Sequence, residues 1–232
     1  MYAKFFKRVL DFLLSLIALT VLSPILLILA AIGAVAMGGN PFFVQYRPGK
    51  VDKKTNKEKI FKLIKFRSMS NKKDVDGNLL PDHERLNKYG RFLRTASLDE
   101  LPELINILKG DMSMVGPRPL LVRDMTFMTE SQRRRHTVRP GLTGLAQING
   151  RNNISWEQKF EHDLEYIDKG ITMRGDIKIL FGTVTKVIRG TDTVREGTDS
   201  DMDLGDWLLD QGKISENTYK EKQEEARALI EV

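Results

Sequence analysis

Residues 12–37 read FLLSLIALTVLSPILLILAAIGAVAM, a run without a single charged side chain. As an α-helix, these roughly 26 residues would be about 39 Å long, enough to cross the hydrocarbon core of a bilayer. A cleaved signal peptide has a shorter apolar region followed by a small-residue cleavage site, so the length favours a segment that is retained. The sequence therefore predicts an N-terminal membrane segment.

The way this segment sits in the bilayer depends on Ser23-Pro24 at its centre. Proline removes a backbone donor and clashes with the carbonyl group of Thr20, which predicts a kink; the hydroxyls of Ser23 or Thr20 are the nearest groups that could satisfy the freed backbone. Each arm is then about 12 residues, or roughly 18 Å, too short to cross. Basic residues flank both ends, whereas a spanning helix favours positive charge on one side. A re-entrant hairpin fits both observations, and a spanning helix with a tolerated proline stays open.

Length and charge limit what the rest of the chain does. At 232 residues there is room for one catalytic unit with a core and an appendage, but not for two large domains. The formal charge of +6 suits a phosphate-rich partner: nucleic acid, anionic lipid or a nucleotide-sugar. There is no cysteine, so disulfides and thiolate metal sites are excluded, and the three histidines are too far apart in sequence to suggest a metal motif.

After the glycines at 38 and 39 the composition becomes that of a soluble domain. We place the membrane segment at 1–40, a catalytic domain at 41–190 and a C-terminal extension of unknown role at 191–232. The expected elements are a β-hairpin from strands at 42–46 and 59–66, and helices at 83–94, 99–108, 120–135, 155–168, 177–189 and from 215 onward, the last of them exposed. The helix at 120–135 suits either the bilayer surface or the core. The predicted fold class is α+β, mainly helical, with a small β element and no doubly wound parallel sheet.

The segment RTASLDELPELINILKGDMSMVGPRPLL, 94–121, carries the predicted chemistry. Pro102 fits best in the first turn of a helix, which places Asp99 and Glu100 at that helix's N-terminus. Free amides and the positive end of the dipole would lower the pKa of a carboxylate there and attract phosphate. Asp99 is therefore a candidate nucleophile toward phosphorus, and the pair is a candidate for holding a divalent cation. The alternative is that both acids serve only as helix caps.

Arginines in rigid turns surround this pair in the sequence. Arg94 precedes it and Arg118 follows it in Gly-Pro-Arg-Pro, and arginine matches phosphate oxygens in a bidentate manner. A second turn, RPGLTGLAQINGR at 139–151, ends in Arg151. Neither turn is a Walker A or GxGxxG loop. The Asp pairs among positions 199, 201 and 203 are interpreted as solvated loop acids.

Together, the Ser-Pro in the membrane helix, KLIKFRSM (62–69), SLDELPELINILKGDMSMVGPRPLL (97–121) and RPGLTGLAQINGR (139–151) resemble the bacterial sugar transferases known as small monotopic phosphoglycosyl transferases. The resemblance runs from about Lys4 to Arg189. It implies a re-entrant helix hairpin broken at Ser23-Pro24, on the cytoplasmic face of the bacterial inner membrane, in contact with membrane phospholipid.

The resemblance also implies a two-step reaction, in which Asp99 attacks the β-phosphate of a UDP-sugar, releases UMP, and passes the phosphosugar to polyprenyl (undecaprenyl) phosphate. Glu100 would assist, and Mg²⁺ is the expected ion, with Asp99 as its ligand. Nucleic acid is not an expected partner, and the sugar and the oligomeric state stay open. By match of motif, the residues that contact phosphate, nucleotide or sugar would be Lys65, Arg94, Arg118 and Arg151, with Asp176 as a further polar member.

Two rival interpretations remain. In one, the basic turns of a membrane-anchored module hold lipid or nucleic-acid phosphate without turnover. In the other, the sugar-phosphate is transferred directly in a ternary complex and Asp99 is only a metal ligand.

Overall fold

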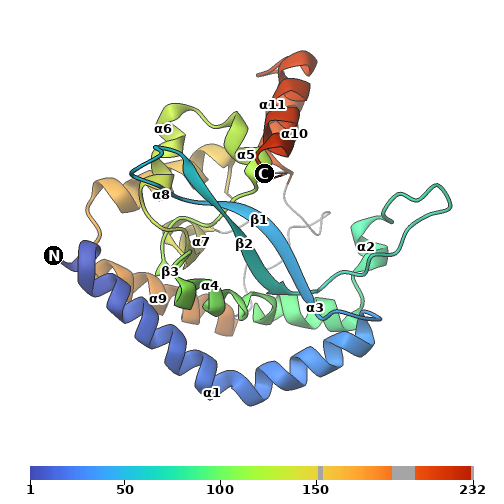
Figure 1. Cartoon of the computed structure of the whole chain (residues 1–232), viewed down its shortest axis with the longest axis horizontal. Helices are drawn as coiled ribbons and strands as arrows, with labels where there is room; N and C mark the ends of the chain where they lie inside the picture. The colour runs from blue at the N-terminus through green and yellow to red at the C-terminus, as the bar shows by residue number, and fades with distance from the viewer. Residues whose placement is uncertain (151–153, 190–201, 231–232) are drawn as a thin grey trace.

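A computed structural model of the chain describes residues 1–150, 154–189 and 202–230. Helices surround two small sheets, and one long N-terminal helix runs along one side of the molecule (Figure 1). In chain order the described elements are η1 (Tyr2–Phe6), α1 (Lys7–Ala36), β1 (Phe42–Val51), β2 (Glu58–Phe66), α2 (Asp82–Arg85), α3 (Lys88–Thr95), η2 (Leu98–Glu100), α4 (Glu103–Lys109), β3 (Ser113–Val115), α5 (Val122–Phe127), α6 (Glu130–Arg133), η3 (Arg134–Thr137), β4 (Gly141–Thr143), α7 (Leu145–Asn149), α8 (Trp156–Asp168), α9 (Met173–Arg189), α10 (Leu204–Asp210) and α11 (Glu216–Ala228). The predicted mainly helical α+β class is confirmed.

The long helix α1 bends near its middle, where it contains Pro24 (Figure 1). The Ser23 hydroxyl donates to the carbonyl oxygen of Thr20 at 2.8 Å, the acceptor that Pro24 deprives of its helical partner. This confirms the prediction that a local hydroxyl satisfies the freed backbone. The helix is long and apolar enough to cross a membrane, and most of its large side chains are exposed, as Ile17 (58%) and Leu27 (71%) illustrate.

The hairpin of β1 and β2 is antiparallel and packs one face onto α4. Phe61 and Leu63 of β2 are buried against Leu104 and Ile107, which lie on the inner side of α4. Ala18 of α1 packs against the same cluster, so the membrane helix and the hairpin share a core. The strands are longer than predicted because pairing continues past the residues whose apolar pattern marked them.

The prediction of one continuous helix at 83–94 is wrong, because the helix is interrupted between α2 and α3. Leu86 adopts an extended conformation after α2, and the Asn87 side chain then caps α3 by accepting from Gly90 N at 2.8 Å. A Cβ on Gly90 would lie 1.8 Å from the Ser68 carbonyl oxygen. Glycine at this position thus lets α3 pack directly on the segment that follows β2.

A short parallel pair joins the two proline-glycine-arginine turns, and no sequence pattern predicted it. Strands β3 and β4 pair in parallel, and the bonds continue past them, from Gly116 N to the Thr143 carbonyl oxygen (2.8 Å) and from Gly141 N to that of Pro117 (2.9 Å). The backbones approach too closely for a side chain, since a Cβ on Gly141 would lie 2.1 Å from Gly116 N. The turns are thereby fixed relative to each other.

The predicted helix at 120–135 is replaced by α5, α6 and the 3-10 turn η3. Val122 and Met125 of α5 are 1% and 2% exposed, so this segment belongs to the core and not to a bilayer surface. The chain breaks because Met128 is extended and Thr129 starts α6 with a capping box to Gln132. The apolar residues that suggested an interfacial helix are used for internal packing.

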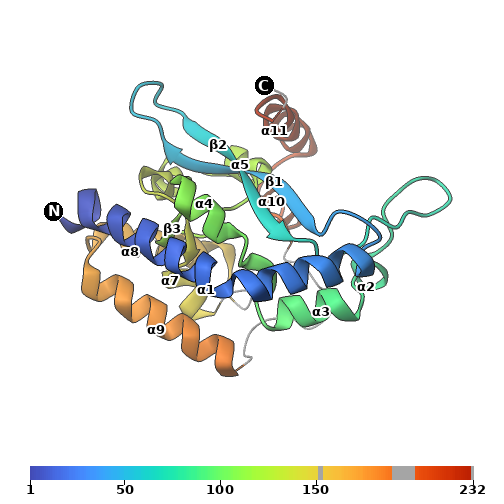
Figure 2. The same ribbon diagram turned by 60° about the horizontal axis from the view of Figure 1, so that its bottom comes forward.

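An exposed apolar face is found instead on α9. Met173, Ile177, Phe181 and Val184 follow helical spacing and are each more than half exposed. Figure 2 shows α9 next to the N-terminal half of α1, so the two apolar faces lie on the same part of the molecule.

The predicted capping box of Ser155 at the start of α8 is confirmed.

The described part of the C-terminal extension packs on α5 and α8. Leu204 of α10 is 2% exposed in a cluster with Trp156 and Phe160 of α8. Ala226 of α11 is equally buried, next to Met125. The expectation of an exposed terminal helix is therefore wrong for its inner face.

Candidate active site

Three charged side chains meet between the end of β2 and the start of α4. The Lys65 ammonium lies 3.1 Å from Glu100 Oε1 and 3.0 Å from Glu103 Oε1, and its side chain is 16% exposed. Glu103, with a side chain 3% exposed, is held beneath the surface. The register of the hairpin points Lys65 toward η2 and α4, which brings a residue 35 positions away in sequence to Glu100.

Arg118 approaches the same carboxylate from the Gly-Pro-Arg-Pro turn. Its Nη2 donates to Glu100 Oε1 at 2.6 Å, while its side chain remains 44% exposed. The turn is fixed from behind, because the buried Arg135 donates to the Arg118 carbonyl oxygen at 2.6 Å and is itself paired with Asp163. Glu100 is therefore the anion that holds two predicted phosphate-binding cations, Lys65 and Arg118, in one place.

Asp99 occupies a different position from the one predicted. It lies in the 3-10 turn η2, ahead of α4, whose N-cap is Pro102. The preceding Ser97 has φ 54°, a left-handed conformation that is costly for a non-glycine residue and common at functional sites. Among the residues that the structure describes, the Asp99 carboxylate makes no hydrogen bond and no ion pair within 4 Å. Its oxygens are free for a ligand.

The expected lowering of the Asp99 pKa is also wrong. Burial, followed by repulsion from Glu100, raises the pKa of Asp99 to about 6, although Lys65, Arg118 and Arg94 act in the opposite direction. The 3-10 turn provides no long helix dipole to outweigh these effects. Asp99 is consequently an anion at neutral pH, but one that gains from a nearby positive charge or from forming a bond.

The other two carboxyls differ sharply from each other. Burial alone would raise the pKa of Glu100, but Arg118 and Lys65 attract its negative charge strongly enough to hold that pKa far below the ordinary value. Burial raises the pKa of Glu103 to about 7, despite its contact with Lys65. Glu103 was missed in the sequence; its spacing of three and four residues from Glu100 and Asp99 was the available signal.

Arg94 lies on α3 beside this cluster. Its Nε donates to the Ser68 hydroxyl at 3.1 Å and its Nη2 contacts the Met69 sulfur at 2.8 Å. Its charge lowers the pKa of Asp99, so it faces the same site as Lys65 and Arg118. Three of the predicted phosphate-binding cations therefore lie around Asp99.

Two predicted site residues are not part of this described cluster. Arg151 lies outside the described residues, as do positions 199 and 201 of the aspartate pairs, whereas Asp203 forms an ion pair with Arg123. Asp176 is 4% exposed and accepts from Tyr2 (2.7 Å), Lys7 (2.6 Å) and Tyr166 (2.8 Å). It joins the start of α1 to α8 and α9, and its contact with a substrate stays a prediction.

The donor set around Asp99 is compatible with Mg²⁺ but not with a metal held by protein alone. Among the described residues no group of three or more His, Asp or Glu side chains could enclose a metal ion. Mg²⁺ usually keeps several waters and uses one or two carboxylates together with substrate phosphates. The free Asp99 carboxylate fits that pattern.

Residues 2–190 match the family model described as bacterial sugar transferase. A Bacillus subtilis (strain 168) protein described as uncharacterized sugar transferase EpsL is 50% identical over 182 residues, which are 78% of this chain and 87% of that protein.

Two longer relatives carry names that state an activity. The Klebsiella pneumoniae protein named UDP-glucose:undecaprenyl-phosphate glucose-1-phosphate transferase is 39% identical over 78% of this chain and 40% of its own length. The Salmonella typhimurium (strain LT2) protein named undecaprenyl-phosphate galactose phosphotransferase is 34% identical over 81% of this chain and 41% of its own length. The chain thus spans about two fifths of these two relatives.

Proposed function

The chain belongs to the bacterial sugar transferase family, and we propose that it moves a sugar-1-phosphate from a UDP-sugar to undecaprenyl phosphate, with release of UMP. The names of the Klebsiella and Salmonella relatives support the acceptor and the transferred group. The observation that carries the proposal is a free, half-buried Asp99 carboxylate among Lys65, Arg94 and Arg118. Such a site can hold a diphosphate while presenting an anionic nucleophile to it.

In the first step an Asp99 carboxylate oxygen attacks the β-phosphorus of the UDP-sugar. A bond forms between that oxygen and phosphorus, and the bond from the β-phosphorus to the bridging oxygen breaks. The bridging oxygen leaves with the electron pair as part of UMP, and the phosphosugar remains on Asp99. With a pKa of about 6, Asp99 is mostly ionised at pH 7 and needs no separate base.

In the second step a phosphate oxygen of undecaprenyl phosphate attacks the aspartyl phosphorus. The new diphosphate bond forms as the bond from phosphorus to Asp99 breaks, which regenerates the free carboxylate. Because Asp99 is less stable as an anion here than in water, forming the covalent intermediate favourably moves the negative charge from its carboxylate to the phosphoryl oxygens.

The remaining residues bind and position the donor. Arg118, with an exposed guanidinium, and Lys65 hold the diphosphate oxygens, and Glu100 keeps both cations oriented toward the same point. Asp99 is the residue that would hold Mg²⁺, and the bound ion would supply positive charge that stabilises the leaving phosphate. Glu103 contacts Lys65 from beneath without reaching the surface.

We place this site at the cytoplasmic face of the inner membrane. The bend at Pro24 directs both ends of α1 toward the body of the molecule, which suits a helix that enters and leaves the same leaflet (Figure 1). The exposed apolar residues of α9 then lie at the bilayer surface. This arrangement lets an acceptor held in the membrane by its polyprenyl chain reach Asp99.

The test uses the full-length protein in detergent with radiolabelled UDP-sugars, first without and then with undecaprenyl phosphate. Without acceptor, a single stoichiometric burst of UMP and a phosphosugar on residue 99, detected by mass spectrometry, are expected. Asp99→Asn should give neither. Sequential kinetics, with UMP released only when acceptor is present, would support direct transfer and exclude the covalent route. No UMP release with any donor would favour a phosphate-binding module.

A further inference from the structure

A small cavity lies between the N-terminal part of α1, the C-terminal end of β1 and the segment before β4. Its volume is about 50 Å³, room for roughly three to five water-sized atoms. Lys7, Arg8, Lys50 and Arg139 line it, and Asp11 is the one carboxylate among its described lining residues. The cavity therefore combines the size of a single phosphate group with a surplus of positive charge.

Some of these groups are already engaged. Lys7 is paired with Asp176 at 2.6 Å, and Asp11 accepts from Met114 N at 3.0 Å. Arg8 donates to the carbonyl oxygens of Ile107 and Leu108, at 2.6 and 2.8 Å, and so closes the C-terminal end of α4. These bonds satisfy donors of Arg8 without neutralising its charge.

Lys50 and Arg139 have no counterion among the described residues. Within the described parts of the chain, the Lys50 ammonium makes no hydrogen bond or ion pair, and Arg139 donates only from Nε, to the Gly110 carbonyl oxygen at 2.8 Å. Asp111, which acts electrostatically on Arg8, is paired with Lys59 at 2.9 Å. Burial and then the charge of Arg139 lower the pKa of Lys50. Positive charges that lower each other's pKa in a recess would be stabilised by a bound anion.

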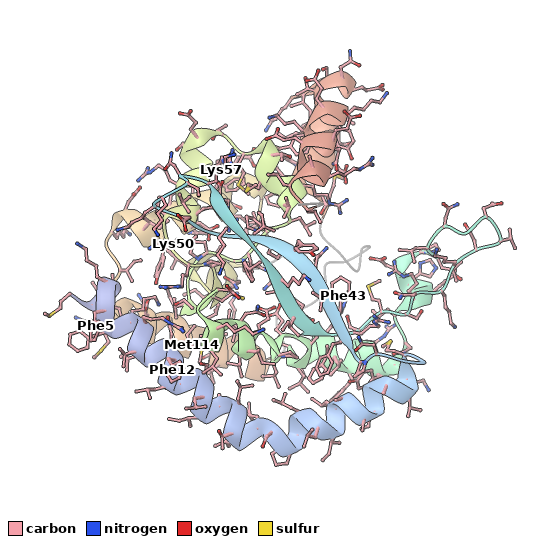
Figure 3. All side chains as sticks on the ribbon, in the orientation of Figure 1. Phe5, Phe12, Phe43, Lys50, Lys57 and Met114 are labelled. Atoms are coloured by element: carbon pink, nitrogen blue, oxygen red, sulfur yellow. The ribbon has the colours of Figure 1, made fainter. Side chains whose placement is uncertain are left out.

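We propose that Lys50, Arg139 and Arg8 form a second phosphate site, which binds the headgroup phosphate of an anionic membrane lipid. The lipid source is argued from position, because the same cavity is lined by the first turns of α1, where the apolar helix begins. Figure 3 shows Lys50 on the part of β1 next to this half of the helix, where Phe5 and Phe12 are labelled. The inference rests on the proposed membrane placement of α1.

This cavity is separate from the catalytic cluster. Lys65 is paired with Phe43 at one end of the hairpin, and Lys50 follows Phe43 by seven residues along β1. At about 3.3 Å per residue the two lysines are about 23 Å apart along the sheet. None of the residues that surround Asp99 lines the cavity. A lipid here would fix the height of the protein at the bilayer surface without competing with the donor.

The experiment is native mass spectrometry of the full-length protein in detergent containing equimolar phosphatidylglycerol and phosphatidylcholine. The wild type should retain phosphatidylglycerol over phosphatidylcholine, and Lys50→Gln should lower that ratio about fivefold, the effect of losing one cation at a lipid surface. Lys57→Gln is the matched control, since Lys57 is exposed in the loop of the same hairpin and its loss changes the net charge equally. It should leave the ratio unchanged.

Three outcomes would overturn the site: equal retention of the two lipids by the wild type, an equal loss in Lys57→Gln, or a Lys50→Gln ratio like that of the wild type. Millimolar inorganic phosphate provides a second arm. Displacement of phosphatidylglycerol from the wild type supports a phosphate-specific site, whereas phosphate binding with no lipid preference refutes the lipid as its source. Co-sedimentation with phosphatidylcholine vesicles and UMP release are measured in parallel, so failure of the membrane placement or of the enzyme activity is distinguished from failure of this site.

Discussion

The rate of the first half-reaction should fall at acid pH, and the midpoint of this acid limb of the pH–rate profile should report the raised pKa of Asp99. With a pKa of about 6, Asp99 is ionised in roughly nine molecules in ten at pH 7, half at pH 6 and one in ten at pH 5. If only the anion attacks phosphorus, the rate of UMP release should fall about tenfold from pH 7 to pH 5. With an ordinary pKa of 3.8, the rate would fall by only about a twentieth over the same range.

The assay is a rapid-quench single turnover without acceptor, since the phosphate of a polyprenyl acceptor titrates in the same range and the diester phosphates of the donor do not. Glu100→Gln removes the repulsion that is the second cause of the shift, so the midpoint should move to lower pH even though the rate falls. Added Mg²⁺ should move it in the same direction.

Glu103→Gln is the control for assignment, because the pKa of Glu103 is also raised, to about 7. If Asp99 is the titrating group, the acid limb persists in this variant. A wild-type midpoint near 4, a midpoint that rises in Glu100→Gln, or a limb that vanishes in Glu103→Gln would each refute the role given to Asp99.

The remaining predictions concern stability and topology. Asp99→Asn should abolish UMP release yet stabilise the fold by about 3 kcal/mol at pH 7, because a pKa raised on folding means that the native state disfavours the charge. Denaturant titration should show this gain vanishing below about pH 4, where Asp99 is protonated in both states. Arg135→Met leaves the Asp163 carboxylate buried without its partner and should cost about 3–5 kcal/mol in the same titration, whereas replacing both residues by apolar ones should cost less. Gly90→Ala should destabilise by about 1–3 kcal/mol and lower UMP release, since its Cβ meets backbone at 1.8 Å; an unchanged unfolding midpoint would contradict the packing of α3. Pro24→Ala should let α1 straighten and span the bilayer. Because the chain has no cysteine, a single cysteine introduced at position 4 can be probed from the periplasmic side with an impermeant thiol reagent. Labelling of that cysteine with Pro24 intact would disprove the re-entrant helix.

Local patterns in the sequence determined much of this protein. The uncharged stretch before Met37, the hydroxyl that satisfies the backbone at Pro24 and the capping box of Ser155 each depend on residues a few positions apart. The pairing of Asp99 with Glu100 and the arginines near them is also visible in sequence. Such features are predictable because propensity, capping and hydrophobic length act within one segment.

Only the tertiary structure decided how these pieces act together. Lys65 of β2 meets Glu100 of η2 and Glu103 of α4, and β3 and β4 fix the two turns, through contacts between segments far apart in the chain. The same packing buries Asp99 beside Glu100 and raises its pKa, against the local expectation from a helix terminus. It also gives Asp176 three donors, one each from η1, α1 and α8. Burial and the charges of distant segments set these properties, and neither is encoded in the spacing of neighbouring residues.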